Sequence, residues 1–292
     1  MKYKLIADDK YGFKKISPVP SSDEIAEYYA NEFYASYDKD KINDSSLSVQ
    51  QRDKEFYDSW RIDLADAIEE KFPGKKIKVF DFGCGWCETI GLFNSRGHEC
   101  YGIDTAIDAI DHGIKSGFNV AVSDLVSLNP FDKKYDLVIM QNVLEHLADP
   151  EAILSEIFSN MLNDGGFIYI DVPNEFNAFQ VAGEKLHKLG EWWVAPPAHL
   201  NYFSADSIQN LLVAIGFEIN DVMSSFPLEM FLLMGDKYVG NSELGRLCHE
   251  KRMAFEKNLR DYAGTEALHT FYRALASVNL GRQVMVMARK PV

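Results

Sequence analysis

The stretch VFDFGCGWC, residues 79–87, decides the fold and admits two interpretations. Cys84 and Cys87 have the C-x-x-C spacing of a redox or metal-binding pair. Gly83 and Gly85, however, follow a short apolar stretch and precede a helical pattern. At such a position the missing Cβ lets backbone N–H groups approach a bound ligand. The rest of the chain must decide between a thiol site and a glycine-rich ligand-binding loop.

The composition is that of an ordinary globular protein: 292 residues, 47% of them hydrophobic and 25% charged. Only four cysteines are present, and no His or Cys near them has the spacing of a zinc site, so we expect no structural metal. The formal net charge of −14 argues against nucleic acid and anionic lipid as partners. We find no apolar run long enough for a membrane span and no signal peptide, and therefore expect a cytoplasmic protein.

Strand and helix patterns alternate from about residue 55 to residue 220. Seven apolar stretches predict strands, at residues 77–83, 99–104, 118–124, 135–142, 165–173, 217–222 and 282–289. Such alternation is typical of a doubly wound, mainly parallel sheet that binds ligands at the carboxyl ends of its strands. The predicted fold class is therefore α/β, a seven-stranded Rossmann-like sheet with helical insertions.

The predicted domain organisation follows from this pattern. Residues 1–54 form an N-terminal helical segment, opened by a capping box at Ser21 and Glu24. This segment either closes over a ligand as a lid or packs on the surface, and we favour the lid. The Rossmann-like domain is expected at residues 55–224 plus 283–292. The insertions at residues 174–203 and 225–282 are expected to form a substrate-binding cap.

Three acidic residues accompany the glycine loop. Asp104 ends the next predicted strand, where a carboxylate can accept both hydroxyls of a ribose. NAD enzymes favour G-x-G-x-x-G, whereas here Asp81 places negative charge beside the loop, which suits a ligand with an ammonium and a sulfonium. Asp124 ends the following strand, where it can accept an adenine amino group. Together these residues fit S-adenosylmethionine (SAM) better than a dinucleotide.

The sequence resembles the class I SAM-dependent methyltransferases, in the branch acting on small molecules and glycan precursors. VFDFGCGWC, YGID, VSDL, MQNVLEHLADP and GGFIYIDVPN match that family's motifs in order and spacing. PPAHLNYFSADSIQNLLVAIGF further resembles the helix and strand that follow in that branch. The resemblance covers about residues 55 to 220 plus the last strand, and implies SAM as cofactor and S-adenosylhomocysteine (SAH) as product.

The resemblance also implies roles for individual residues around the cofactor. Cys87 departs from the family pattern, which usually has a third glycine there, and this puts cofactor affinity in question. Because both cysteines fall inside the loop, the redox interpretation of the C-x-x-C spacing is weakened. The implied cofactor contacts are Gly83 and Gly85 at the methionine part, Asp81 at its amino group, Asp104 at the ribose, Asp124 and Leu125 at the adenine, and Gln141 and Asn142 at the sulfonium.

Methyl transfer from a sulfonium is a direct displacement, so the enzyme mainly aligns the reacting atoms and excludes water. A hydroxyl acceptor must also lose a proton, for which a neutral histidine is suited. We predict His199 as this base and Tyr202 as a hydrogen-bonding assistant. For His146, catalysis and hydrogen bonding within its turn both remain open. We find no cluster for a catalytic magnesium ion and expect a metal-free mechanism.

Two further groups of residues have open interpretations. Trp192 and Trp193 form either a stacking wall for a ring or packing anchors. A small basic face in the second insertion either binds a phosphate or carboxylate of the substrate or, as we favour, pairs with nearby acids. The basic residues are Arg246, His249 and Arg252, and the acids are Glu243, Glu250 and Glu256.

Three hypotheses for function remain. The first is metal-independent O-methylation of a small acceptor, a sugar or glycan precursor that is phosphorylated or not, with nitrogen or carbon as less favoured target atoms. The second is an NAD(P)-dependent oxidoreductase, motivated by the glycine turn and Asp104. The third is a SAM-binding protein without turnover, motivated by Cys87.

Overall fold

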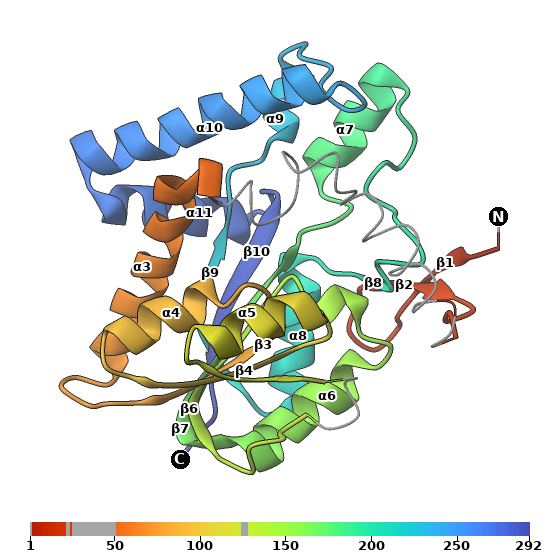
Figure 1. Cartoon of the computed structure of the whole chain (residues 1–292). Coiled ribbons are helices and arrows are strands. Elements are labelled where there is room, and N and C mark those ends of the chain that lie inside the picture. Colours follow the sequence, from red (N-terminus) through yellow and green to blue (C-terminus); the bar gives the residue numbers. More distant parts are fainter. Residues whose placement is uncertain (1, 22–23, 25–50, 124–127) are drawn as a thin grey trace. The chain divides into compact units, whose positions relative to one another are not determined.

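The computed structural model describes residues 2–21, 24, 51–123 and 128–292, and Figure 1 labels its elements. A larger sheet has the strand order β5-β4-β3-β6-β7-β10-β9, and a smaller one has the order β1-β2-β8. The pairs β3–β4, β3–β6 and β4–β5 are parallel. The seven-stranded, mostly parallel sheet confirms the predicted Rossmann-like α/β fold.

All seven predicted strands are present. They are β3 (Lys78–Phe82), β4 (Glu99–Asp104), β5 (Asn119–Val122), β6 (Tyr135–Gln141), β7 (Leu162–Pro173), β9 (Glu218–Ser224) and β10 (Gln283–Arg289). The helices of the alternating region are α3 (Lys54–Lys71), α4 (Glu88–Ser95), α5 (Ile107–Lys115), α6 (Pro150–Glu156) with a π-helical continuation (Ile157–Met161), and α8 (Ala205–Ile215). The insertions contribute α7 (Ala178–His187), α9 (Glu229–Leu233), α10 (Ser242–Ala263) and α11 (Thr265–Ser277).

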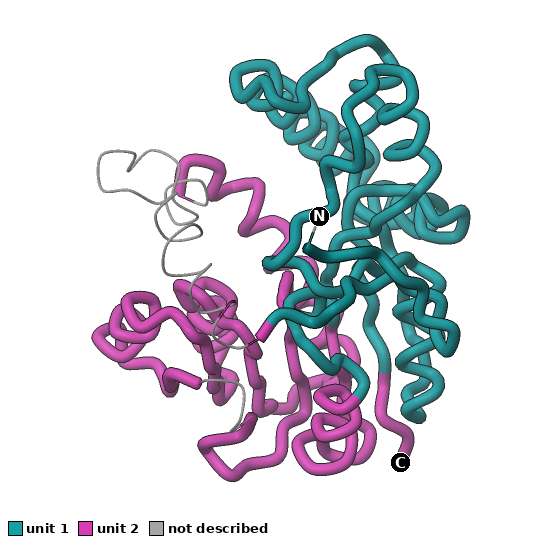
Figure 2. Tube along the Cα trace, turned by 90° about the vertical axis from the view of Figure 1, so that its right-hand side faces the viewer, with its two compact units in different colours: residues 1–20, 144–151, 170–288 teal, residues 21–143, 152–169, 289–292 magenta. Residues whose placement is uncertain are grey.

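The chain divides into two compact units, which Figure 2 colours separately. Unit 1 comprises residues 1–20, 144–151 and 170–288, and unit 2 comprises residues 21–143, 152–169 and 289–292. Unit 2 holds β3 to β6 with α3, α4 and α5. Unit 1 holds the three-stranded sheet and both predicted insertions, together with α8 and β9.

Continuous apolar runs account for the central strands of unit 2. In β3 the side chains of Val79, Phe80 and Phe82 are fully buried, and so are those of residues 137–140 in β6. A parallel strand is buried on both faces, so its sequence is mostly apolar rather than alternating. Phe80 also packs against Tyr135, with ring centroids 4.7 Å apart.

Local signals at helix ends behave as the sequence predicts. Ser204 caps α8 by accepting from the backbone N–H of Ser207, and the Ser207 hydroxyl accepts from the Ser204 N–H in return. Gly216 ends the helix with φ of 118°. The capping box at Ser21 and Glu24 is also formed, with hydrogen bonds of 3.0 and 3.2 Å.

The N-terminal residues contain an element that the sequence did not predict. Strands β1 (Lys4–Ala7) and β2 (Lys14–Ser17) form an antiparallel hairpin, and β2 pairs with β8 (Asn201–Tyr202). The first 20 residues are therefore not part of a helical segment. The body of the predicted lid helix lies outside the described residues. Within the described ranges, no helix is both long and apolar enough to cross a membrane.

Candidate functional site

The strand register of unit 2 brings the predicted cofactor residues to one edge. Phe82 of β3 is level with Ile103 of β4 and with Met140 of β6. Gly83, Asp104 and Gln141 are the next residues of the three strands, so they lie side by side where the strands end. This is the edge at which a doubly wound sheet binds its ligand.

Backbone hydrogen bonds fix the glycine loop at this edge. The Gly83 N–H donates to the carbonyl of Ile103 over 2.8 Å. The Gly85 N–H donates to Asp104 Oδ2 over 2.8 Å, and the Ala106 N–H donates to Asp104 Oδ1 over the same distance. The Asp104 carboxylate therefore joins the loop after β3 to the turn after β4. Asp104 thus anchors the glycine loop in addition to its predicted role at the ribose.

Gly83 is required by both conformation and space. Its φ of 80° lies in the left-handed region, which side-chain-bearing residues rarely adopt. A Cβ built at Gly83 would overlap the side chain of Val143, two residues after the end of β6. Val143 was not among the predicted site residues, because nothing in its apolar type marks it as a wall of the loop.

Of the other predicted cofactor residues of unit 2, the structure describes Gln141 and Asn142 but not Asp124 and Leu125. Gln141 Oε1 accepts from the Thr89 hydroxyl of α4 over 3.3 Å, which links the end of β6 to the helix after the loop. Asn142 is left-handed, with φ of 54°. Asp124 and Leu125, predicted at the adenine, lie outside the described residues.

Asp81 lies within β3, and only 4% of its surface is exposed. Burial and, to a smaller extent, the negative charge of Asp104 together raise the pKa of this carboxyl to about 7, while Arg61 acts in the opposite direction. A buried carboxyl of this kind is poised to ionise when a cation binds beside it.

The two loop cysteines are buried and belong to the packing of the loop. The Cys84 side chain lies against Gly102 of β4, and the Cys87 thiol lies against Gly113 of α5. Cys87 is the residue before α4 and has φ of 65°, a conformation in which glycine is easier to place. The loop therefore tolerates cysteine in place of the family's glycine at a conformational cost, and the Cys87 thiol is not exposed.

We expect Cys84 to resist alkylation in the native protein near pH 8, the usual range for a free thiol. The neighbouring Cys87 thiol and burial both raise the pKa of Cys84 far above its ordinary value, which removes the reactive thiolate. Peptide mass spectrometry after iodoacetamide treatment measures this, with guanidine-unfolded protein as the reference in which all four cysteines react. Rapid labelling of native Cys84, or its ready oxidation to a disulfide, would restore the redox interpretation.

In unit 1, the predicted catalytic histidines lie together. The rings of His146 and His199 meet edge to face, with centroids 4.9 Å apart. Burial lowers the pKa of His146, and burial, with the nearby His146 and Arg282, lowers that of His199 to about 4. Both rings are therefore neutral near pH 7. Glu145, which was not among the predicted site residues, precedes His146, and its carboxylate oxygen lies 3.6 Å from His146 Nε2.

Tyr202 and the tryptophans have structural roles in unit 1. The Tyr202 hydroxyl accepts from the Ala195 N–H and donates to the His199 carbonyl, each over 3.1 Å. It therefore holds the loop that carries His199. Trp193 is buried and packs against Trp192 with centroids 4.7 Å apart, as expected for a packing anchor.

The basic face of the second insertion is paired with acids, as favoured from the sequence. Arg246 Nε donates to Glu250 over 2.8 Å, and Arg252 Nε donates to Glu256 over the same distance. Glu256 is only 1% exposed, so the second pair is part of the packing of α10. These arginines are therefore satisfied within their own helix.

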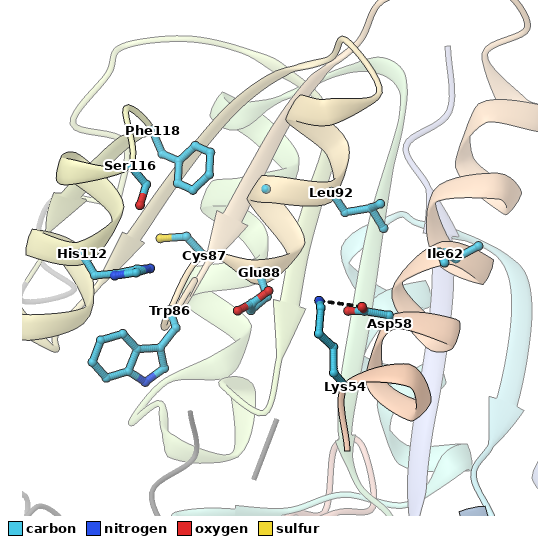
Figure 3. A pocket seen from close by; sticks show the side chains of 11 residues that line it. Lys54, Asp58, Ile62, Trp86, Cys87, Glu88, Leu92, His112, Ser116 and Phe118 are labelled. Atoms are coloured by element: carbon cyan, nitrogen blue, oxygen red, sulfur yellow. Dashed lines mark ion pairs between the residues drawn. The ribbon is translucent and has the colours of Figure 1, made fainter. Parts of the chain in front are cut away.

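A cavity of about 400 Å³ lies in unit 2 between α3, α4 and α5. Figure 3 shows Trp86, Glu88 and His112 along it, and Lys54 paired with Asp58 at 2.6 Å. None of the predicted cofactor residues at the strand ends lines this cavity. It borders the end of the glycine loop through Trp86 and Cys87 but does not include the predicted cofactor residues.

Comparison with known proteins agrees with this arrangement. A family model described as a methyltransferase domain matches residues 51–222, more than half of the chain. The chain therefore belongs to the methyltransferase-domain family. It is a SAM-dependent methyltransferase with SAM as its cofactor, and the second hypothesis, a nicotinamide-dependent oxidoreductase, is set aside. No curated protein sequence matches the chain.

Solved structures share the fold at low sequence identity. Magnesium protoporphyrin IX methyltransferase from Synechocystis PCC 6803 with bound SAH has 13% identity and a TM-score of 0.55, covering 92% of this chain and 100% of that one. The plantazolicin methyltransferase in complex with SAH has 16% identity and a TM-score of 0.52, covering 92% and 94%. A SAM-dependent methyltransferase from Archaeoglobus fulgidus has 20% identity and a TM-score of 0.51, covering 82% and 98%.

Proposed function

We propose that the chain transfers the methyl group of SAM to a hydroxyl of a small acceptor, a sugar or glycan precursor. The observation that carries the proposal is the strand-end edge of unit 2, where Gly83, Gly85 and Asp104 are held by hydrogen bonds of 2.8 Å. In this proposal SAM lies over the glycine loop, with its ribose at Asp104 and its amino group near Asp81. Gln141 and Asn142 flank the sulfonium.

The reaction requires little covalent chemistry from the protein. The acceptor O–CH₃ bond forms as the S–CH₃ bond breaks, and the sulfonium takes the electron pair and becomes the thioether of SAH. The hydroxyl proton passes to an imidazole nitrogen, and we assign it to Nδ1 of His199. This atom is buried and has no hydrogen-bond partner in the described part of the chain. A positioned proton acceptor favours oxygen over nitrogen or carbon as the target.

The choice of a small acceptor rests on charge and on the insertions. A formal net charge of −14 disfavours polyanionic substrates such as nucleic acid. Both insertions belong to unit 1, as does His199, so the proposed base and the segments available for substrate recognition are parts of one unit. The structural neighbours are named for unlike substrates, so the fold alone does not select the acceptor.

An acceptor screen tests the proposal. Purified protein is incubated with SAM and a panel of free sugars, nucleotide sugars and amines, and SAH is quantified. We expect SAH to form in proportion to a hydroxylated acceptor, whose mass increases by one CH₂. Absence of acceptor-dependent SAH across the panel, with SAM bound, would instead support the third hypothesis, a binding protein without turnover.

Replacing His199 by Ala should lower the turnover of the acceptor found in that screen by roughly 100-fold or more while sparing cofactor affinity. The proton acceptor is lost, whereas the strand-end edge in unit 2 is unchanged. Initial rates and SAH titrations measure the two effects separately. His269→Ala, on α11, is the matched control. Wild-type turnover in the His199 variant would leave this residue only a packing role.

Affinity for SAH should fall as the pH is lowered from about 7.5 to about 5.5. The pKa of Asp81 is raised to about 7 in the free protein, so below this pH the carboxyl must lose a proton before it can pair with the ligand's ammonium. The favourable pairing is thus present above pH 7 and is lost below it. Calorimetric titration over this range measures the effect. Asp81→Asn should bind SAH more weakly, with an affinity that does not change with pH. A wild-type affinity that does not change with pH would show that Asp81 does not pair with the amino group.

A further inference from the structure

Three metal-ligating side chains meet in unit 1. Glu145 and His146 belong to a short 3₁₀ helix (Leu144–His146), and His199 lies on the loop before β8. One ligand atom from each residue can be chosen so that all three lie within 4.8 Å of one another. Among the described residues, no other group of three His, Cys, Asp or Glu side chains meets this condition.

The two segments that carry these side chains are joined by backbone hydrogen bonds. The Leu200 N–H donates to the Glu145 carbonyl over 2.8 Å, and the Asn201 side chain donates to the Leu147 carbonyl over 2.7 Å. The Leu200 carbonyl in turn accepts from the N–H of Ile16, a residue of β2 in the small sheet. The ligand side chains therefore project from a frame that is already fixed, which is what a binding site for an ion needs.

The hydrogen bond of His146 determines which of its nitrogens faces the cluster as an acceptor. Nδ1 lies 2.8 Å from the Ala198 carbonyl, which can only accept, so Nδ1 carries the hydrogen. In the neutral ring, Nε2 then presents its lone pair, and it lies 3.6 Å from Glu145 Oε1. Metal-binding histidines usually have such a bond from the second nitrogen to a carbonyl, because it orients the ring.

The other two residues have buried polar atoms that lack a protein partner. Glu145 Oε2 and His199 Nδ1 are both buried, and neither has a hydrogen-bond partner within the described residues. The side chain of Glu145 is only 2% exposed. Buried polar atoms in native proteins are rarely left unpaired, so an unpaired carboxylate oxygen and an unpaired imidazole nitrogen in one cluster point to a ligand that binds both.

We propose that Glu145, His146 and His199 bind one divalent transition-metal ion, with Zn²⁺ as the best match. Two imidazole nitrogens and one carboxylate form a donor set used by catalytic zinc sites, which keep a further position open. Mg²⁺ is disfavoured because it prefers oxygen ligands. Ligand atoms around zinc are roughly 3.4 Å apart, so the cluster has to contract through side-chain rotation.

Charges of both signs act on the cluster, with Arg282 acting on His199 and two acids acting on Glu145. Asp171 and Glu175, from the end of β7 and the residues after it, are the acids whose negative charges act on Glu145. The Glu175 side chain is buried, and the buried Oδ1 atom of Asp171 has no hydrogen-bond partner in the described ranges. A divalent ion bound to Glu145 and the two histidines would offset this negative field.

The role of the open position rests on the proposed function, whereas binding of the ion does not. A bound ion would occupy the lone pair of His199, so His199 would be a ligand of the ion and not the base of the metal-free route proposed above. The acceptor hydroxyl would then be activated by the ion, and its proton would pass to water. Zn²⁺ lowers the pKa of a bound hydroxyl, as it does for water. This inference departs from the metal-free mechanism expected from the sequence.

Metal titration of the full-length protein tests the inference. Protein treated with a chelator and desalted is titrated with ZnCl₂ in competition with a chromophoric chelator, and with CoCl₂ to observe the visible absorption of tetrahedral cobalt. We expect one equivalent of tight binding, with Mg²⁺ failing to compete. Glu145→Gln and His199→Ala should each weaken Zn²⁺ binding at least tenfold, whereas His269→Ala should bind as the wild type does.

The possible outcomes separate the ion site from the proposed function. Failure of Zn²⁺ to bind wild-type protein, or unchanged affinity in both folded ligand variants, would overturn the ion site. Folding of the variants is checked by thermal unfolding, where added Zn²⁺ should raise the wild-type midpoint more than those of the ligand variants. Tight Zn²⁺ binding without any methylated acceptor would refute only the proposed function, and acceptor methylation by a protein that binds no Zn²⁺ would refute only the ion site.

Discussion

Gly83→Ala should lose most of its affinity for SAH, on the order of 100-fold, and should be destabilised by about 2–4 kcal/mol. The alanine would have to adopt the left-handed backbone conformation of Gly83, with φ of 80°, and its Cβ would overlap the side chain of Val143. To relieve the overlap, the loop or Val143 must shift, which misplaces the N–H groups that the loop presents. Calorimetric titration with SAH and chemical unfolding measure the two effects.

Gly117→Ala is a matched control for this experiment. Its φ of 82° is nearly that of Gly83, but no atom lies within 4 Å of a Cβ built there. It should therefore show only the backbone cost, about 1 kcal/mol, with SAH affinity unchanged. If the two variants behaved alike in binding, close packing of the glycine loop would not be what positions the cofactor.

Asp104→Ala should weaken SAH binding by about 1–3 kcal/mol, which is roughly 5- to 150-fold. The variant loses the charge-assisted hydrogen bonds expected to the ribose and also the two bonds of 2.8 Å that hold Gly85 and Ala106. Titration with SAH measures the loss. Asp104→Asn, which retains one acceptor oxygen, should fall between the wild type and the Ala variant.

A second variant serves as the charge control for Asp104→Ala. Asp108→Ala removes an acid of α5 close in sequence, whose exposed side chain is not part of the strand-end edge. It should retain wild-type affinity, so a loss confined to Asp104 excludes a general effect of charge. A folded Asp104→Ala protein with wild-type affinity would remove this residue from the cofactor site.

Much of the fold was predictable because the sheet of unit 2 is built from short-range signals. Strands buried on both faces contain continuous apolar runs, such as residues 137–140 within Tyr135–Gln141, and helices are marked by residues such as Ser204 and Gly216. The hairpin of β1 and β2 was missed because its strands have only four residues each, too few to show a period, and β1 is largely exposed. The pairing of β2 with β8 depends on residues far along the chain.

The strand-end edge was predictable for a related reason. In a parallel sheet, residues that follow neighbouring strands end at the same edge, so Gly83, Asp104 and Gln141 could be grouped from strand positions alone. The cluster of Glu145, His146 and His199 could not be grouped in this way. It depends on a loop that folds back through the bond between His146 and the Ala198 carbonyl, and no periodic pattern encodes such a contact.

The central claim is that the glycine loop binds a SAM-type ligand, and calorimetric titration of the wild-type protein with SAH and, separately, with NADH tests it most directly. We predict that SAH binds with one equivalent per chain, that Asp104→Ala weakens this binding, and that NADH gives no binding heat. Binding of NADH together with indifference to SAH would contradict the account.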